Sequence, residues 1–464
     1  MTAAFDLAIE GGTVVHASGR RREHLYIRGG RLAHLGAEER SAREVVDAGG
    51  LYVLPGMVDT HVHLMDPGDP EREDFPTGTA AAAARGVTTI VEHTHGHPVR
   101  EVADLEQKRR HLEGRSRVDY GLAAHAWPDR ISEVPVLWEA GITFFKIFTC
   151  TTHGVPGFDT AQLRTAFEAI AGVGGSCLVH CEDETLTTEA ERRLRAAGRR
   201  DGGVVIEWRS REAESAAVAV VLGLAGDTGV RATIAHVSHP EVAHMVAGAQ
   251  AQGADVAAEA CPQYFLLREQ EVLIQGGLRK FTPPARARSE ADEEQMWDLL
   301  RSGVFGHVSS DHAPSTLAQK TEGSIWDVHF GVPGLDTTLP LLLDSALGGK
   351  ISLEDLVRTY STGPARRYGF YPRKGRLAEG SDADLVLVDP SGHWDIHHDE
   401  VISKAGWTPY AGRRVRGRIV AAYLRGRRIA EQGEPSDELN GRFLPGPGAG
   451  PRARPGSLDA DAAG

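Results

Sequence analysis

Eight apolar runs, separated by segments with helical periodicity, constrain the fold of this 464-residue chain more than any other feature. Branched, aromatic and alanine side chains dominate these runs, as is typical of parallel strands that are buried on both faces. Strands that alternate with helices predict an α/β fold, and eight repeats are the number in a (β/α)₈ TIM barrel. A doubly wound open sheet is the competing fold, but no glycine-rich phosphate fingerprint follows the first run. The runs lie at residues 57–64, 87–93, 118–125, 142–148, 176–181, 231–237, 254–260 and 306–311.

The two ends of the chain differ from this middle region. Residues 1–53 and 373–433 contain short alternating apolar runs punctuated by glycines, a pattern typical of hairpins. We expect both segments to build one small β-sandwich beside a barrel at residues 54–372. Residues 434–464 are rich in Pro, Gly and Ala, and this composition predicts a flexible C-terminal tail.

The net charge, the N-terminal sequence and the cysteines indicate which partners and which cell compartment to expect. A formal net charge of −13 argues against nucleic acid or an anionic membrane as the main partner. The N-terminus lacks the basic and apolar regions of a signal peptide, and no apolar stretch is long enough to span a bilayer. The four cysteines lie within or beside apolar runs, as is typical of reduced thiols. These features predict a cytoplasmic protein.

Residues able to bind metal ions stand at the ends of five of the runs. In a barrel these carboxyl ends meet at one face, where active sites are built. His61 and His63 point to the same side of their strand, and Asp59 has the parity needed to orient one of them. Each such residue alone is more often a core histidine or a helix cap, but together they predict a metal site. The candidate ligands are His61, His63, Lys146, His180, His236 and Asp311.

Lys146 is the unusual member of this set because it lies within an apolar run. It shares one strand face with Phe144 and Phe148, and burial among such side chains lowers the pKa of an amine. A neutral amine can add carbon dioxide and become a carbamate, an anion able to bridge two divalent cations. An ion pair with an acid such as Glu182 or Asp311 is the alternative, but it leaves four convergent histidines unexplained.

Several motifs, together with the strand lysine, resemble the cyclic-amidase branch of the amidohydrolase superfamily: LPGMVDTHVHLMDPG, HCE, IAHVSHPE, EACPQYFLL and SSDHAP. That branch contains allantoinases, hydantoinases, dihydropyrimidinases and dihydroorotases, and the resemblance extends from about residue 5 to 432. It implies that Lys146 is carboxylated and bridges two metal ions, usually zinc, with the first histidine pair on one ion and the two later histidines on the other. It also implies that Asp311 contacts the first ion and carries a proton in catalysis. The substrate would be a small molecule, and the enzyme a homo-oligomer, either a tetramer or a dimer.

Individual positions are most similar to allantoinases within that branch. Dihydroorotases typically have an arginine where this chain has Met65. Dihydropyrimidinases and hydantoinases have a tyrosine at the position of Thr151 and an asparagine at that of Phe330. Cys150 stands four residues after the lysine, as a cysteine tends to in allantoinases. The resemblance therefore implies opening of allantoin to allantoate, with hydantoin or dihydropyrimidine opening as the alternative and dihydroorotase activity as a weaker one.

Loops after the strands are expected to select the substrate. The stretch VEHTHGHPV departs from the allantoinase pattern, so His95 and His97 are either pocket residues or polar loop residues. The candidate substrate contacts are Cys150, Thr151, His95, Thr282 and Gly331. Two other functional classes are less well supported by the sequence. A metal-free scaffold relative is disfavoured because all six ligand positions are present, and a mononuclear deaminase does not use a lysine on the fourth strand.

Overall fold

The protein has an α/β fold in a computed structural model that describes residues 5–450. Each of the eight predicted runs contains strand structure, and the third run is divided into two short strands. The bounds are β8 (Met57–Val62), β9 (Val87–Glu92), β10 (Asp119–Leu122), β11 (Ala124–His125), β12 (Phe145–Phe148), β13 (Ser176–His180), β14 (Arg231–Ile234), β15 (Val256–Ala260) and β16 (Phe305–Val308). All pairings among them are parallel, in a sheet of order β10-β9-β8 and a second of order β11-β12-β13-β14-β15-β16.

The two parallel sheets meet at both of their ends. Ala123, the single residue between β10 and β11, donates its N–H to Glu92 O at 3.1 Å, where the third run passes from one sheet to the other. At the opposite end, Val62 of β8 forms a parallel bridge with His312, which follows β16. The N–H of His63 donates to His312 O at 2.8 Å. The carboxyl ends of the first and last strands are therefore adjacent.

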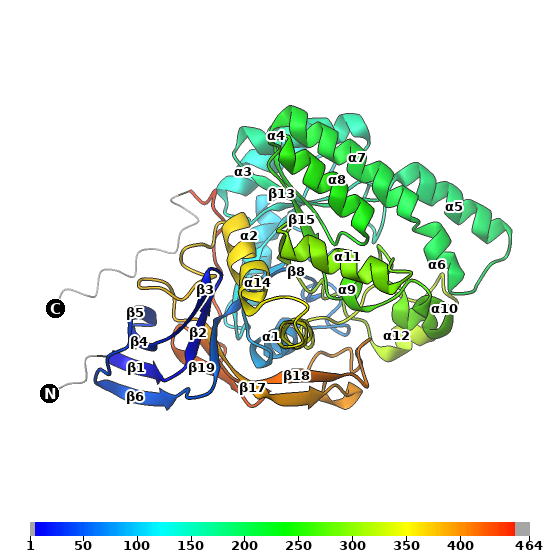
Figure 1. Ribbon diagram of the computed structural model, residues 1–464. Helices are drawn as coiled ribbons and strands as arrows, with labels where there is room; N and C mark the ends of the chain where they lie inside the picture. Colours follow the sequence, from blue (N-terminus) through cyan, green and yellow to red (C-terminus); the bar gives the residue numbers. More distant parts are fainter. Residues whose placement is uncertain (1–4, 451–464) are drawn as a thin grey trace.

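Helices connect these strands and cover their outer side (Figure 1). The helix bounds are α1 (Phe75–Ala84), α2 (Val102–Leu112), α3 (Val134–Glu139), α4 (Thr160–Gly172), α5 (Glu184–Ala196), α6 (Gly203–Trp208), α7 (Arg211–Thr228), α8 (Pro240–Ala251), α9 (Gln263–Leu266), α10 (Glu271–Gln275), α11 (Glu290–Arg301), α12 (Leu317–Thr321), α13 (Thr338–Leu347), α14 (Leu353–Val357) and α15 (Gly363–Arg367). Side-chain caps start several of them: Asp159 accepts the N–H of Gln162 at α4, and Ser210 accepts that of Ala213 at α7. None of the helices among residues 5–450 is long and apolar enough to cross a membrane.

Strands from both ends of the chain pair with one another beside the parallel sheets, at the lower left and bottom of Figure 1. Their bounds are β1 (Phe5–Glu10), β2 (Thr13–His16), β3 (Gly19–Arg22), β4 (His24–Arg28), β5 (Arg31–Gly36), β6 (Ala42–Asp47), β7 (Tyr52–Pro55), β17 (Leu385–Asp395), β18 (Arg414–Leu424), β19 (Arg427–Glu431) and β20 (Glu434–Pro435). They form a sheet of order β5-β4-β1-β6 and a second of order β20-β19-β18-β17-β7-β2-β3. Leu25 of the first sheet is buried in one apolar cluster with Val53, Leu385 and Tyr423 of the second, so the two sheets share a core.

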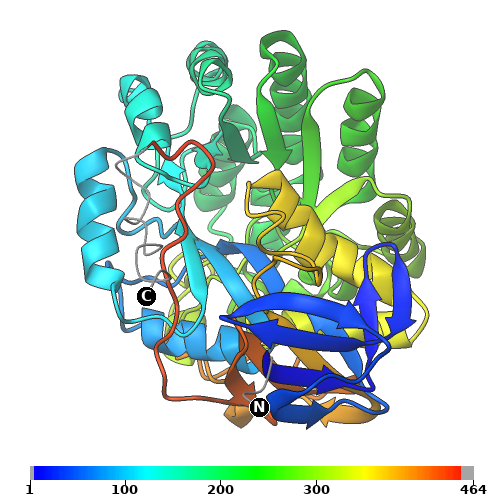
Figure 2. The ribbon, with the colours of Figure 1, turned by 90° about the vertical axis from the view of Figure 1, so that its left-hand side faces the viewer.

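Residues 434–450 do not form the flexible tail that their composition predicts. After β20, the chain runs along the edge of β10, as the red segment in Figure 2 shows. Tyr120 donates its N–H to Arg442 O at 2.9 Å and accepts the N–H of Leu444 at 2.7 Å, and Gly450 donates to Glu139 O at 2.9 Å. The segment is ordered because it satisfies backbone groups at this edge that no other strand pairs with in this region. Residues 451–464 of the expected tail lie outside the described residues.

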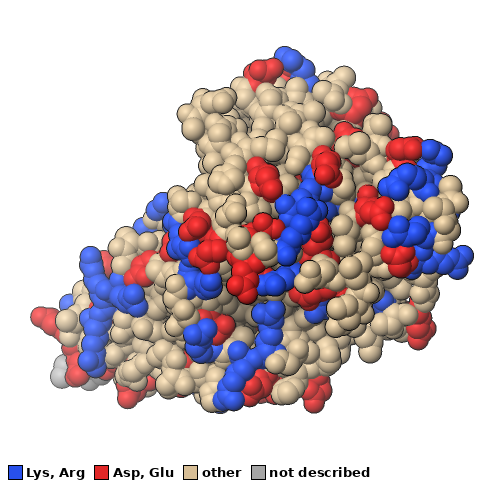
Figure 3. Space-filling view, turned by 45° about the vertical axis from the view of Figure 1, so that its right-hand side comes forward, with Lys and Arg blue, Asp and Glu red and all other residues tan. Residues whose placement is uncertain are grey.

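A buried ion cluster ties β10 to the C-terminal strands. Nζ of Lys374 lies 2.6 Å from Asp119, 2.6 Å from Asp384 and 2.9 Å from Asp382, and 1% of the lysine side chain is exposed. Burial lowers the pKa of Lys374, but the surrounding aspartates outweigh burial and raise it overall. By contrast, acidic and basic side chains are interspersed over the surface drawn in Figure 3.

We predict that Lys374→Met lowers the free energy of unfolding by about 3–5 kcal/mol, because it removes a cation shared by three buried aspartates and leaves Asp384 without an ion-pair partner among the described residues. Lys350→Met is the matched control, since Lys350 pairs with Glu294 while 53% of its side chain is exposed, and it should cost about 0–1 kcal/mol. Chemical denaturation followed by circular dichroism measures both. Equal, small effects of the two substitutions would contradict a structural role for the cluster.

Candidate metal centre

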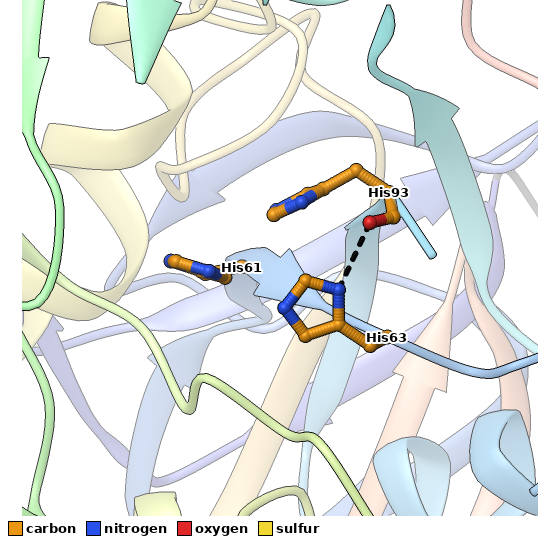
Figure 4. A group of neighbouring side chains, drawn as sticks. All are labelled: His61, His63 and His93. Atoms are coloured by element: carbon orange, nitrogen blue, oxygen red, sulfur yellow. Dashed lines mark hydrogen bonds between the residues drawn. The ribbon is translucent and has the colours of Figure 1, made fainter. Parts of the chain in front are cut away.

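His61 and His63 present one ring nitrogen each to the same carboxylate. Nδ1 of His61 lies 2.7 Å from Glu259 Oε1, and Nδ1 of His63 lies 2.9 Å from the carbonyl oxygen of His93 (Figure 4). These contacts turn both Nε2 atoms toward Oδ1 of Asp311, at 3.2 and 3.5 Å. Burial raises the pKa of Asp311, but the neighbouring imidazoles outweigh it and lower the pKa overall. Two nitrogen lone pairs and an ionised carboxylate therefore converge on one point.

Asp311 reaches these imidazoles from a strained loop after β16. Its φ of +49° lies in the left-handed region, which costs a non-glycine residue about 1–2 kcal/mol. The buried carboxylate of Asp59 accepts the N–H of Ser310 at 3.1 Å and the hydroxyl of Tyr360 at 2.7 Å. Asp59 thus holds the backbone next to Asp311 and accepts the N–H of His61 at 3.3 Å. Among residues 5–450 it forms no hydrogen bond with a histidine ring, contrary to the expectation from its strand parity. The reason is that β8 lies beside the segment after β16, so the side chain meets that backbone first.

His180 and His236 form a second pair of imidazoles. Nδ1 of His180 lies 3.0 Å from Nε2 of His236, while Nε2 of His180 lies 2.8 Å from Glu182 Oε2. Burial lowers the pKa of both histidines, so both rings are neutral near pH 7. Nδ1 of His236 is buried and has no hydrogen-bond partner among the described residues. Two facing nitrogens that both carry lone pairs repel each other unless a proton or a cation lies between them.

Lys146 lies between the two histidine pairs without a carboxylate partner. Its Nζ is 3.4 Å from Nε2 of His61 and 5.3 Å from the centre of the Phe148 ring. Within residues 5–450 it forms no ion pair, because Glu182 is occupied instead by Arg209. Burial lowers the pKa of Lys146 to about 8, against the opposing influence of nearby acids. The structure therefore does not show the ion pair considered from the sequence, and leaves a buried amine that is partly neutral near pH 7.

One cavity of about 230 Å³ brings the predicted metal ligands together. All six line it, and so do three of the five predicted substrate contacts: His95, Thr282 and Gly331. The other walls are partly apolar, with Met65, Phe148, Phe281 and Phe330, and partly polar, with Asp69, Arg72, Thr94 and His153. An uncharged polar ring with one apolar face fits such a lining.

Cys150 and Thr151 do not line this cavity. The Cys150 thiol is buried beside the guanidinium of Arg209 at 3.4 Å, and burial raises its pKa to about 12. Thr151 is exposed, and its N–H donates to Glu184. Cys150 lies against Arg209, which in turn binds Glu182 at 3.2 Å. Cys150 lies behind the site because the chain turns away from the cavity directly after β12.

Glu259 is a site residue that the sequence analysis missed. Its carboxylate oxygens lie 2.7 Å from Nδ1 of His61 and 3.2 Å from Nε2 of His307, and one of them accepts the N–H of His236 at 3.1 Å. The residue is fully buried. Burial raises the pKa of Glu259, but these partners outweigh it and lower the pKa overall. The signal was present in the sequence, because a glutamate within the apolar run 254–260 is as unusual as the lysine within 142–148.

His93 and His125 were also missed, although each ends one of the predicted runs. The ring of His93 is buried with its centroid 4.5 Å from that of His63, and Nε2 of His125 lies 3.1 Å from Nδ1 of His95. Burial lowers the pKa of His93, His95 and His125, so these three rings are neutral. Of these three, His95 lines the cavity, while His93 and His125 are buried beside residues that line it.

Comparison with known proteins assigns the chain to a family. A family model described as the amidohydrolase family matches residues 52–428. The chain belongs to the amidohydrolase family. It is 35% identical to the allantoinase of Rubrobacter xylanophilus, over 95% of this chain and 98% of that protein. It is 31% identical to the L-hydantoinase of Paenarthrobacter aurescens, over 93% of this chain and 95% of that protein.

Solved structures of this family have the same fold. The L-hydantoinase (dihydropyrimidinase) from Arthrobacter aurescens superposes with a TM-score of 0.91 at 30% identity, over 95% of this chain and 100% of that chain. The dihydropyrimidinase from Brevibacillus agri superposes with a TM-score of 0.89 at 27% identity, over 97% and 99%. These findings confirm the resemblance to the cyclic-amidase branch and the α/β fold that the alternating runs predict.

Proposed function

We propose that the protein is a hydrolase that uses two divalent metal ions to open a cyclic amide or ureide ring, with allantoin as the leading substrate and allantoate as the product. The observation that carries this proposal is the convergence of buried imidazoles, a carboxylate and an unpaired amine on one cavity. Similarity to an allantoinase over nearly the whole length of both chains supports the substrate class.

We also propose that the two parallel sheets close into one (β/α)₈ barrel. The bridge between Val62 and His312 supports closure on one side, and the passage of the third run between the sheets supports it on the other. In a closed barrel the carboxyl ends of all strands form one rim. Such a rim accounts for site residues that come from five strands and surround one cavity.

The donor set fits two divalent ions, which we expect to be Zn²⁺. Nε2 of His61 and of His63 would hold one ion with Asp311, while Nδ1 of His180 and Nε2 of His236 would hold the other. Burial lowers the pKa of His63, His180 and His236. The outer ring nitrogens of the four histidines contact a carboxylate or a carbonyl oxygen in three of the four cases. Such outer contacts are typical of zinc-binding histidines, because they fix both the tautomer and the direction of the lone pair.

Lys146 is the residue that would bridge the two ions, as a carbamate. Its neutral amine would attack carbon dioxide, form a nitrogen–carbon bond and lose a proton, which leaves one negative charge shared by two oxygens. The pKa of about 8 leaves roughly a tenth of the amine neutral at pH 7. The absence of a carboxylate partner among the described residues leaves the amine accessible to this reaction.

Asp311 is the proposed proton carrier. When bound, the two ions acidify a water molecule and polarise the substrate carbonyl. Asp311 accepts a proton from the water as the oxygen adds to the carbonyl carbon, and donates it to the ring nitrogen as the carbon–nitrogen bond breaks. The product is a ureido acid. Asp311 is suited to this role because neighbouring imidazoles keep it ionised while its side chain remains at the cavity wall.

A second candidate function is hydrolysis of hydantoins with aromatic substituents. Phe330 lines the cavity and contacts Trp208, which in turn contacts Trp326, with ring centroids 5.5 and 5.1 Å apart. Phe330, with the two tryptophans packed behind it, gives the cavity an apolar surface that suits an aromatic substituent. The TM-score of 0.91 with an L-hydantoinase supports the same alternative. The polar residues His95, His153 and Arg72 on the cavity wall favour allantoin, because its exocyclic ureido group needs hydrogen-bond partners.

A ring-opening screen tests both functions. Zinc-loaded protein is incubated with allantoin, 5-benzylhydantoin and dihydrouracil, and with carbamoyl-aspartate for ring closure, and the products are separated by chromatography. We expect allantoate from allantoin as the fastest reaction. Turnover of 5-benzylhydantoin without turnover of allantoin would favour the second candidate, and no ring opening with any compound would contradict both.

We predict that Lys146→Ala abolishes metal-dependent ring opening, because the bridging anion is lost. Short carboxylic acids such as acetate or propionate should restore part of the activity by filling the vacated ligand position. Steady-state rates with and without added acid measure the effect. Lys350→Ala, at an exposed lysine far from the cavity, is the control and should keep wild-type rates. Full activity of Lys146→Ala without added acid would contradict the bridging role.

We predict that Asp311→Asn lowers the turnover number by about 10²–10⁴-fold, because an amide cannot carry the proton between water and ring nitrogen. Circular dichroism should show an unchanged fold. Asp227→Asn removes the same charge from an exposed position on α7 and should leave turnover unchanged. A near-normal rate for Asp311→Asn would remove this carboxylate from the mechanism.

A further inference from the structure

Arg72 is a half-buried arginine on the wall of the candidate cavity. Its Nε donates to the carbonyl oxygen of Pro314 at 2.9 Å. Within residues 5–450 the side chain forms no ion pair, and no oxygen accepts a hydrogen bond from Nη1 or Nη2. A guanidinium carries several N–H donors in a planar fork and stays charged in proteins. The two Nη groups are therefore available to a molecule bound in the cavity.

The loop after β8 holds this guanidinium in place. Asp69 donates its N–H to Met65 O at 2.7 Å, and Arg72 donates its own to Asp69 O at 3.1 Å. Pro314 follows Asp311 in the loop after β16, so Nε is tied to the loop that carries the proposed proton carrier. The free Nη groups are therefore preorganised relative to the proposed reacting centre, which lowers the entropy lost on binding.

A second cavity, of about 370 Å³, adjoins the first at Arg72. The two cavities share Arg72, His153 and Phe330. Lys280 lines the second cavity, with Nζ 4.3 Å from the centre of the Phe330 ring, and donates to Val328 O at 2.6 Å. Lys280 forms no ion pair with any residue that the structure describes. Two cations without a carboxylate partner thus lie at or beside the junction of the cavities.

The acids near these two cations pair with neither of them. Apart from the predicted metal ligands, the acidic residues among the described side chains that line the two cavities are Asp69 and Asp327. Asp69 attracts Arg72 but forms no ion pair with it. Asp327 is exposed and accepts the N–H and the hydroxyl of Ser324 at 3.1 and 2.6 Å. The strongest partner for a free guanidinium fork is a carboxylate, so this region favours a bound group with acyl oxygens.

A cyclic ureide can present such an oxygen through its exocyclic substituent. In allantoin this substituent is a ureido group, whose carbonyl carbon is separated from the ring by one nitrogen atom. A carboxymethyl group places a carboxylate carbon at the same separation, with a methylene in place of the nitrogen. A carboxylate can accept two parallel N–H bonds from one guanidinium, and such charge-assisted bonds are stronger than neutral ones. Both substituents therefore fit the same donors.

We propose that Arg72 determines specificity by donating from its Nη groups to the acyl oxygen of the exocyclic substituent, and that 5-carboxymethylhydantoin is a further substrate. This inference rests on the ring opening of the proposed function and adds the residue that recognises the substituent. One water is consumed: its oxygen stays on the ring carbonyl carbon, which becomes a carboxyl group as the carbon–nitrogen bond breaks. The ring nitrogen takes the proton that Asp311 carries, and the product is N-carbamoyl-aspartate.

Steady-state kinetics of the zinc-loaded, full-length protein test the inference. The comparison substrate is 5-isobutylhydantoin, which has nearly the same shape as 5-carboxymethylhydantoin but no acyl oxygen. We expect the wild type to favour the carboxymethyl compound by more than about tenfold in kcat/KM, mainly through a lower KM. Arg72→Met should lower this ratio by more than about tenfold, and Arg72→Lys should keep part of it. Arg164→Met, at an exposed arginine on α4, is the control and should leave the ratio unchanged.

Equal or better turnover of 5-isobutylhydantoin by the wild type, or an unchanged ratio in folded Arg72→Met protein, would overturn the inference. The wild-type comparison does not depend on the folding of any variant. Calorimetric titration with 5-carboxymethylhydantoin measures binding whether or not the ring opens. Ring opening without the preference would sink the role of Arg72 alone, while Arg72-dependent binding without any ring opening would sink the proposed reaction alone. Neither binding nor ring opening would contradict both.

Discussion

The candidate centre depends on contacts made by the outer nitrogens of buried histidines. An imidazole can rotate and can carry its proton on either nitrogen, so its lone pair has no fixed direction until the opposite nitrogen is engaged. Glu259 fixes His61, the carbonyl oxygen of His93 fixes His63, and Glu182 fixes His180. Each of these contacts comes from behind the cavity, so the remaining nitrogens face inward. The strand-end histidines thereby present ring nitrogens in fixed directions toward the cavity.

Two of the predicted metal ligands lie in left-handed backbone, which adds a second constraint of the same kind. His236 has a φ of +37° and Asp311 a φ of +49°, and each follows a strand of the parallel sheets. The N–H of His236 donates to Glu259, and the N–H of Ser310, next to Asp311, donates to Asp59. Buried carboxylates on neighbouring strands therefore hold the backbone in a conformation that these residues would not adopt alone. At both positions the chain turns a side chain into the cavity.

Burial sets the chemistry of this region. The amine of Lys146 and the rings of His63, His180 and His236 all have lowered pKa values because water is excluded from them. Neutral nitrogen is the form that binds metal ions and that reacts with carbon dioxide. In contrast, Lys374 lies equally deep but among three aspartates, and its pKa is raised. The same residue type is thus a candidate reactive group in one place and a structural cation in the other.

The sequence by itself determined the strands and the residues that end them. Apolar runs of strand length and polar residues at their carboxyl ends are local patterns, so the α/β fold and the six candidate metal ligands that line the cavity followed from them. The partners of those residues did not follow, because they depend on which strands are neighbours and in what register. Glu259 meets His61 across the sheets, Asp59 meets the loop after β16, and Cys150 turns behind the cavity. Residues 434–450 are ordered for the same reason: a composition typical of a flexible segment pairs with the edge of β10, which only the tertiary structure makes available.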